Sequence, residues 1–391
     1  MSEAVVPVKS KIRLKYLDGL RGLAALIVFL YHIAREIEWR LQGKGIPAIV
    51  LKSSLIPFGR IAVAIFIVLS GYCLMLPIAK SKRGGISGSL FNYFKRRARR
   101  ILPPYYIAIL FSLLLFAVIP ANLDPYAGTH WQEAQPAFTP GVILSHLLLV
   151  HNFRYEWLYK INGVMWTIAA EWQIYFFFPF LLLPVWRRFG LFITIVIAFV
   201  VGLTPHYLNH YLDSGYFKEA FTWYLGLFAL GMAGAAINFS SQLNMVLLRE
   251  KLPWHLIGIC LTTVFCLQRS YWQNYEAWII DALIGAITTC LLIYCTQHLI
   301  EDKNQKHPQI LRLLGSRPLV GLGSFSYSLY LIHAPLFGPI HLGVNYLPIS
   351  SRSQIFVFGL IAVISGLVVS YLFHLAFERP FMHNVSKRTE I

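Results

Sequence analysis

Long apolar stretches separated by short polar loops recur along the whole chain. Ten of them approach the 17–25 helical residues that cross the hydrocarbon core of a bilayer. They lie at 14–35, 58–79, 99–119, 163–186, 189–205, 218–237, 253–269, 277–299, 318–341 and 354–377. An eleventh run, 141–150, is too short to span, and we expect a short helix there that does not cross. The pattern predicts an all-α, polytopic membrane protein.

Composition agrees with this interpretation. The 391 residues are 57% hydrophobic and only 13% charged, and a soluble protein of this size would need more charge on its surface. A net charge of +17 could indicate nucleic-acid binding. However, the basic residues lie in short loops between apolar runs, where membrane topology explains them better. We therefore expect contact with membrane lipid and no nucleic-acid partner.

The distribution of lysine and arginine predicts the orientation. Most of the 34 Lys and Arg residues fall on one side if both termini are cytoplasmic and 141–150 does not cross. This arrangement gives one membrane domain, 1–391, with a short cytoplasmic tail at 1–13 and a second at 378–391. The long segment 120–162, which carries few basic residues, is then external.

The first predicted helix carries an arginine and a histidine on one face. Arg21 and His32 are eleven residues apart, close to three whole turns, so their side chains point the same way. Ionisable residues inside a membrane cost free energy and are candidates for function. Arg21 alone could simply reach the headgroups, paired with Asp18. His32 lies deep in the run and is the stronger functional candidate.

A basic run, 95–100, precedes the third predicted helix and holds five cations in six residues. Arg97 and Arg100 are three residues apart and share a face. Guanidinium groups bind phosphate bidentately, so this pair could bind a phosphorylated ligand. The alternative is an anchor that contacts anionic lipid.

Two later stretches add polar groups inside predicted spans. Glu171 lies about two turns below the expected external end of its helix, at a depth comparable with that of His32. The two could be a base and the group that orients it, or a structural ion pair. A polar stripe with spacings of four and three follows in the ninth helix, and it could line a substrate site or only pack against other helices. The stripe consists of Ser326, Tyr330 and His333.

The remaining ionisable groups in the apolar runs suggest structural roles. Asp281 belongs to no motif, and we expect it to form a structural pair. The cysteines are odd in number and lack the spacing of metal ligands, so we expect buried free thiols and no metal site. They are Cys73, Cys260, Cys266, Cys290 and Cys295.

Together and in this order, these motifs resemble the acyltransferase 3 family of integral membrane acyltransferases, which includes O-antigen and peptidoglycan O-acetylases. The resemblance covers nearly the whole chain, from Tyr16 to Pro380, although Thr167 stands where serine is more usual. The matching stretches are LDGLRG with the arginine-ten-histidine spacing of Arg21 and His32, Phe66–Tyr72, Arg97 and Arg100 before ILPP, Trp166–Gln173, and Ser326–His333.

The resemblance implies ten core helices, a cytoplasmic acyl-CoA donor and an acceptor hydroxyl on the far side of a bacterial plasma membrane. We expect the stand-alone form, without a C-terminal esterase-like domain. Acetyl-CoA is the default donor, and the acceptor would be a carbohydrate or glycolipid.

The same resemblance suggests a division of roles. His32 would be the general base, and Glu171 would orient its imidazole. The donor would be held by Arg21, Arg97 and Arg100, and the stripe of Ser326, Tyr330 and His333 would line the substrate site.

A transporter or flippase of lipid-linked sugars is the alternative, because it too would need charges and polar stripes inside the membrane. Such proteins often show inverted repeats with broken helices in matching halves, and we find no such symmetry in this sequence. Release of free CoA from acetyl-CoA would distinguish the enzyme from the transporter.

Overall fold

A computed structural model describes most of the chain. The described residues are 14–41, 49–81, 84–119, 130–136, 138–212, 216–217, 220–268, 271, 275–301 and 307–382. The tail expected at 1–13, most of the tail expected at 378–391, and residues 120–129 of the expected external segment lie outside these ranges.

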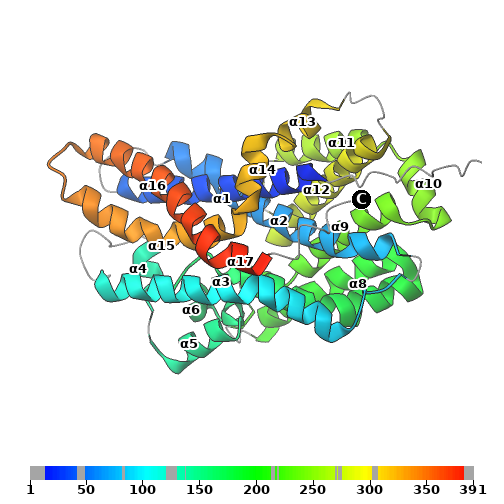
Figure 1. Cartoon of the computed structure of the whole chain (residues 1–391), viewed down its shortest axis with the longest axis horizontal. Helices are drawn as coiled ribbons and strands as arrows, with labels where there is room; N and C mark the ends of the chain where they lie inside the picture. The colour runs from blue at the N-terminus through cyan, green and yellow to red at the C-terminus, as the bar shows by residue number, and fades with distance from the viewer. Residues whose placement is uncertain are drawn as a thin grey trace, which may run out of the picture.

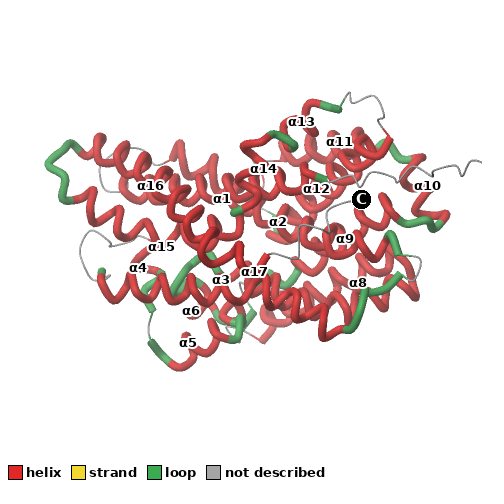
Figure 2. The backbone as a smooth tube through the Cα atoms, viewed as in Figure 1, coloured by secondary structure: helices red, strands yellow, loops and turns green. Residues whose placement is uncertain are grey.

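Throughout the described ranges every regular element is a helix, which confirms the all-α prediction (Figure 2). The long helices are α1 (Lys15–Leu41), α2 (Ile49–Ala79), α3 (Leu90–Val118), α7 (Trp166–Phe177), α8 (Leu183–Leu212), α9 (Tyr224–Phe239), α11 (Trp254–Leu267), α12 (Ala277–Glu301), α15 (Ser326–Asn345) and α16 (Ser351–Phe373). The short ones are α4 (His130–Glu133), α5 (Pro140–Leu147), α6 (Tyr155–Leu158), α10 (Leu243–Lys251), α13 (Gln309–Leu314), α14 (Arg317–Ser324) and α17 (Arg379–Met382). Three further turns are the 3₁₀ turn His151–Phe153 and the π-helical turns Phe178–Leu182 and His374–Glu378.

The number of candidate spans is smaller than the ten predicted. Six helices in the described part of the chain are long and apolar enough to cross a membrane, and there are eight if two bent pairs each count as one span. The pairs are α9 with α10, bent by 92°, and α14 with α15, bent by 71°. The 14-residue helix α11 is too short for this criterion.

The longest candidate span, Trp166–Asn209, is interrupted at Gly190. The backbone there has φ 80° and ψ −173°, a conformation that glycine adopts without steric penalty. Residues on the two sides of this break, among them Ile174, Phe177 and Gly202, line one small cavity. The stretch therefore folds back on itself as a helical hairpin, at the boundary between the predicted helices 163–186 and 189–205.

Helix α1 is central in the arrangement. It packs against α2, α14, α15 and α16, and Figure 1 shows α15 and α16 as a hairpin beside it. Gly22 permits the approach of α14, because a Cβ at this position would lie 2.2 Å from the Leu319 carbonyl oxygen. Small residues of this kind let membrane helices come close.

Buried polar groups join the helices at the Tyr16 end of α1. The Tyr16 hydroxyl lies 2.5 Å from Thr296 Oγ1, which lies 2.6 Å from the Tyr72 hydroxyl. Asn238 Nδ2 donates to Tyr72 at 3.0 Å. The network links α1, α12, α2 and α9, and a buried polar group of this kind is stable only when it is hydrogen-bonded.

The cysteines are all free, but three of them are not fully buried, and Cys73 among these is half-buried. Cys260 and Cys266 are exposed on α11, a helix with no fully buried side chain. Cys290 and Cys295, on α12, are buried.

Candidate functional site

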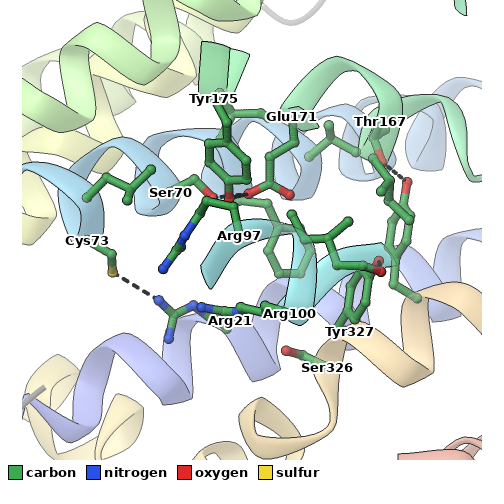
Figure 3. A pocket seen from close by; sticks show the side chains of 17 residues that line it. Arg21, Ser70, Cys73, Arg97, Arg100, Thr167, Glu171, Tyr175, Ser326 and Tyr327 are labelled. Atoms are coloured by element: carbon green, nitrogen blue, oxygen red, sulfur yellow. Dashed lines mark hydrogen bonds between the residues drawn. The ribbon is translucent and has the colours of Figure 1, made fainter. Parts of the chain in front are cut away.

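Two cavities lie along the polar face of α1, and we name them after their chemistry. The arginine cavity, of about 100 Å³, is walled by α1, α2, α3, α7 and α15 (Figure 3). The polar side chains that line it are Arg21, Ser70, Cys73, Arg97, Arg100, Thr167, Glu171, Tyr175, Ser326, Tyr327 and Tyr330.

Three guanidinium groups gather on one side of the arginine cavity (Figure 3). Arg21 Nη1 donates to Asp18 Oδ1 at 3.0 Å, and Nη2 donates to Cys73 Sγ at 2.9 Å. Arg97 lies 5.8 Å over the ring of Tyr175, and its buried Nε has no hydrogen-bond partner. The three arginines outnumber the two acids beside them, Asp18 and Glu171, so this group of side chains carries a net positive charge.

The local sequence of α3 explains which cations reach this cavity. The Ser89 side chain caps the helix by accepting from the Asn92 backbone N–H at 3.2 Å. Arg97 and Arg100 are three residues apart on one helical face, and both line the cavity. Arg99, on another face, is exposed and does not line it.

Glu171 lies in the arginine cavity and does not orient His32, so the predicted pair is wrong. Its carboxylate accepts hydrogen bonds from Ser70 and, at 2.5 Å, from the Tyr175 hydroxyl. The reason lies in the preceding loop. Residues 161–165 are not helical and are largely buried within the bundle, and α7 begins at Trp166. The helix therefore starts inside the bundle and not at its surface, which places Glu171 deeper than a helix entering at 163 would.

The histidine cavity is larger, about 390 Å³, and is walled mainly by α1, α2, α15 and by the short helices and turns of segment 131–164. Aromatic side chains dominate its wall: Tyr31, Phe116, Trp131, Tyr155, Tyr159, Trp166, Phe221, Tyr330 and Phe337. Its charged or ionisable side chains are His32, Arg35, Arg60 and Glu133.

His32 contacts His333. The two ring nitrogens, His32 Nδ1 and His333 Nε2, are 3.4 Å apart. His333 Nδ1 lies 2.8 Å from the Leu329 carbonyl oxygen, which can only accept, so the His333 proton resides on Nδ1. His333 Nε2 is then an acceptor, and His32 must donate from Nδ1. This tautomer places the lone pair of His32 on Nε2.

Arg60 and Asp281 form the structural pair expected for the buried acid. Arg60 Nη2 donates to Asp281 Oδ2 at 2.8 Å and Nε donates to Oδ1 at 3.2 Å. Trp223 Nε1 donates to the same carboxylate at 2.9 Å. The Arg60 charge at the histidine cavity is thus neutralised.

Tyr330 separates the two cavities. It lines both, together with Val63. Its hydroxyl donates to the Val164 carbonyl at 2.9 Å and accepts from Thr167 Oγ1 at 2.7 Å. One aromatic side chain held by two hydrogen bonds is therefore the partition between the guanidinium groups and His32.

The segment that carries Val164 is fixed by a layer outside the candidate spans. His146 and His151 stack with ring centroids 4.0 Å apart, and both are buried. Burial lowers the pKa of His146 despite carbonyl oxygens of Val142 and Lys160 at 2.8 Å from its ring nitrogens. Burial and the neighbouring His146 hold the pKa of His151 well below its ordinary value.

The structure thus groups the predicted residues in a new way. The arginine cavity contains Arg21, Arg97, Arg100, Glu171, Ser326 and Tyr330, and the histidine cavity contains His32 with His333 behind it. Sequence reasoning gave no role to Ser70 and regarded Thr167 as a minor substitution. Both lie in motifs already singled out, but only the fold shows that Ser70 binds Glu171 and Thr167 binds Tyr330. The described residues offer no cluster of three His, Cys, Asp or Glu side chains for a metal ion.

Comparison of the sequence with known proteins identifies the family of this chain. The sequence profile of a family described as an acyltransferase domain matches residues 14–375. This chain belongs to the acyltransferase 3 family. The membrane location predicted from the sequence is confirmed, because this acyltransferase 3 chain combines the family match with several apolar helices of membrane length.

Individual relatives of the acyltransferase 3 chain are distant. It is 23% identical over 346 residues to peptidoglycan O-acetyltransferase OatA of Listeria monocytogenes, covering 82% of this chain and 49% of the relative. It is 23% identical over 373 residues to O-acetyltransferase OatA of Staphylococcus aureus, covering 91% and 56%. Acyltransferase MdmB of Streptomyces mycarofaciens is 29% identical over 171 residues, covering 43% and 39%. The chain spans about half the length of these relatives, and no solved structure matches it.

Proposed function

We propose that this protein transfers an acyl group, acetyl in the simplest case, from acyl-CoA in the arginine cavity to a carbohydrate hydroxyl in the histidine cavity. The observation that carries the proposal is that a cavity of guanidinium groups and a cavity containing His32 meet at two shared residues, Tyr330 and Val63. A protein that joins two chemically different substrates needs such an arrangement.

The arginine cavity suits the donor. CoA carries phosphates, and arginine binds phosphate through charge-assisted, bidentate hydrogen bonds. Arg97 keeps a buried Nε without a protein partner. Arg21 and His32 are separated by about 16 Å along α1, and a pantetheine arm is about as long. The thioester could therefore pass Tyr330 while the nucleotide phosphates stay on the arginines.

The histidine cavity suits a sugar acceptor. Nine aromatic side chains and a few polar groups line it, a combination that is common in sites that bind small organic ligands. Two of the relatives are named as O-acetyltransferases, one of them of peptidoglycan. A hydroxyl of a cell-envelope carbohydrate or glycolipid is the corresponding acceptor here.

His32 would act as general base. Its Nε2 takes the proton of the acceptor hydroxyl while the hydroxyl oxygen attacks the thioester carbonyl carbon. The carbon–sulfur bond breaks, and the proton on His32 passes to the leaving CoA thiolate. His333, in place of Glu171, is the positioning residue, because it fixes the tautomer of His32 and accepts from its Nδ1. Glu171 would instead balance charge among the arginines.

The proposed topology has ten crossings with both termini cytoplasmic. The hairpin at Gly190 supplies two of them, α9 and α15 one each, and α11 another. The remaining five are α1, α2, α3, α12 and α16. The arginine cavity would then face the cytoplasm, where acyl-CoA is available, and segment 120–162 would be external. The accumulation of Lys and Arg around the start of α3 supports this orientation.

The test is thioester consumption by purified protein in detergent. Wild-type protein supplied with acetyl-CoA and an envelope glycan extract should release free CoA and label the glycan with acetyl. His32→Ala protein of equal purity is the control and should release little. Binding or movement of glycan without release of CoA would favour the transporter instead.

A further inference from the structure

The two arginines of the histidine cavity differ in how many hydrogen-bond partners the protein provides for their guanidinium groups. Arg60 makes three hydrogen bonds, two to Asp281 and a third to the Ala277 carbonyl at 3.0 Å. Arg35 lines the same cavity, yet its Nε is buried without a hydrogen-bond partner. Neither a hydrogen bond nor an ion pair reaches Arg35 from the part of the chain that the structure describes.

Two acids nearby, Glu38 and Glu133, do not pair with Arg35. Glu38 is one turn further along α1 and does not line the cavity, and its own Oε1 is buried without a partner. Glu133 lines the cavity but is exposed. A buried guanidinium nitrogen without a partner costs free energy, and an anionic ligand would remove that cost.

The position of Arg35 relates it to the reacting group. It follows His32 by three residues, so the two lie on one face of α1 about 4.5 Å apart along the axis. That separation is within the size of one sugar ring. A ligand whose hydroxyl faces His32 can therefore place a substituent of the same or the adjoining ring on Arg35.

Arg97 provides a parallel in the other cavity. It too combines a cavity-lining position with a buried Nε that lacks a partner, and there the proposed ligand is the phosphate of the donor. Each cavity thus contains an arginine whose buried Nε has no hydrogen-bond partner.

We infer that the acceptor is an acidic glycan, bearing a carboxylate or a phosphate, and that Arg35 binds this group and thereby selects the acceptor. This inference rests on the proposed function, because it assumes that the ligand of the histidine cavity is the acceptor of an acyl group. Binding of an acidic sugar at Arg35 can nevertheless be tested without any acyl transfer.

Binding can be followed by intrinsic fluorescence, because Trp131 and Trp166 line the cavity. Purified protein, free of anionic lipid, is titrated with two matched pairs: glucuronate against glucose, and glucose 6-phosphate against glucose. We expect at least one acid to bind the wild type about tenfold more tightly than glucose, because charge-assisted hydrogen bonds are stronger than those between neutral groups. The pair that shows the preference identifies carboxylate or phosphate.

Substitutions at Arg35 test whether this side chain is responsible for the preference for the acidic sugar. Arg35→Gln should abolish the preference for the acid and leave glucose binding unchanged, whereas Arg35→Lys should retain part of it. Arg352→Gln removes an exposed arginine outside the cavity and serves as the control for net charge. This control should behave as wild type.

Three results would overturn the inference. They are equal or unmeasurable binding of acidic and neutral sugars, an equal loss of both in Arg35→Gln, and Arg35-dependent binding only of dihexanoylphosphatidylglycerol, which would mark a lipid headgroup site. If the acid preference stands while no CoA is released in the assay above, the proposed function fails and the anion site remains.

Discussion

The arginine cavity and the histidine cavity share α1 but are built differently. The first is small, about 100 Å³, and is enclosed by five helices whose polar groups hold one another in place. The second, about 390 Å³, takes much of its wall from segment 131–164, in which short helices alternate with turns and loops. A donor common to many enzymes needs only a fixed site on helices. An acceptor that differs between enzymes is better recognised by loops, which vary without disturbing the bundle.

The chemistry of the two cavities differs in the same way. Three arginines line the arginine cavity, whereas nine aromatic rings line the histidine cavity. Tyr330 belongs to both. If the comparison is correct, substitutions in the first cavity should alter the use of the donor, substitutions in the second should alter catalysis and acceptor binding, and Tyr330 should affect the passage between them.

The largest effect is expected at His32. His32→Ala should lower kcat by ~10²–10⁴-fold, the usual range for loss of a general base, while the KM for acetyl-CoA changes little. Acetyl transfer at saturating donor is the measurement, on protein with the wild-type elution profile in detergent. Turnover close to that of the wild type would remove His32 from the chemistry.

His333→Gln should show a smaller loss than His32→Ala, together with an altered dependence of kcat on pH. The reason is that His333 fixes the tautomer of His32 without touching substrate. The pH profile of kcat is the readout, because damage to packing alone would lower the rate without moving the profile. An unmoved profile would restrict His333 to packing.

The arginine cavity should respond through the donor alone. Arg97→Ala and Arg100→Ala should each raise the KM for acetyl-CoA by ~10–100-fold, because hydrogen bonds to charged groups contribute about 1.5–3 kcal/mol. An acetyl-pantetheine thioester without the nucleotide phosphates should be affected far less. Arg99→Ala, on the exposed face of α3, is the matched control. An equal loss with both donors would mean that the two arginines only anchor the helix.

Tyr330, which lies between the two cavities, should determine which acyl chain lengths the enzyme accepts. Tyr330→Ala should improve the use of butyryl-CoA relative to acetyl-CoA by about tenfold, the order of discrimination that one or two methylene groups produce in a pocket. Tyr330→Phe keeps the ring, loses the hydrogen bonds to Val164 and Thr167, and should retain the wild-type preference. The measurement is kcat/KM as a function of acyl chain length. Identical profiles in the wild type, Tyr330→Ala and Tyr330→Phe would contradict the proposal that Tyr330 separates the two cavities.

The smallest effect concerns the layer that supports Val164. Burial holds the pKa of His146 below its ordinary value, and that of His151 well below it. Below about pH 6.5 the unfolded chain therefore binds more protons than the folded protein, so stability falls as pH falls. We expect Tm to decrease between pH 8 and pH 5, and to decrease less in His151→Phe, which keeps a stacking ring. Parallel curves for the two proteins would exclude this pair as the cause.

The sequence was sufficient for the helical class, and it singled out six of the eleven polar residues that line the arginine cavity without grouping them as one site. Arg97 and Arg100 could be paired because a helix places residues three apart on one face. Tyr330 could be singled out because it interrupts an apolar helix. The partner of Glu171 could not be predicted, because its depth depends on how far residues 161–165 enter the bundle, and their own sequence does not indicate this.

The partner of His32 was also beyond sequence reasoning. His333 was marked as polar, but its contact with His32 depends on how α15 packs against α1. Arg35 shows a further limit. Its importance comes from the partner that it lacks, and a missing partner can be recognised only once the neighbours are in place.

The central claim is that the acyl group passes from one face of the membrane to the other through these two cavities. Sealed vesicles of known orientation, carrying their native glycans, test it directly. Radiolabelled acetyl-CoA, which does not cross membranes, is added to inside-out and to right-side-out vesicles. The account predicts labelled glycan only in inside-out vesicles, resistant to added glycosidase until detergent opens the lumen, and none with His32→Ala. Label appearing from either side, or on the same face as the added donor, would contradict it.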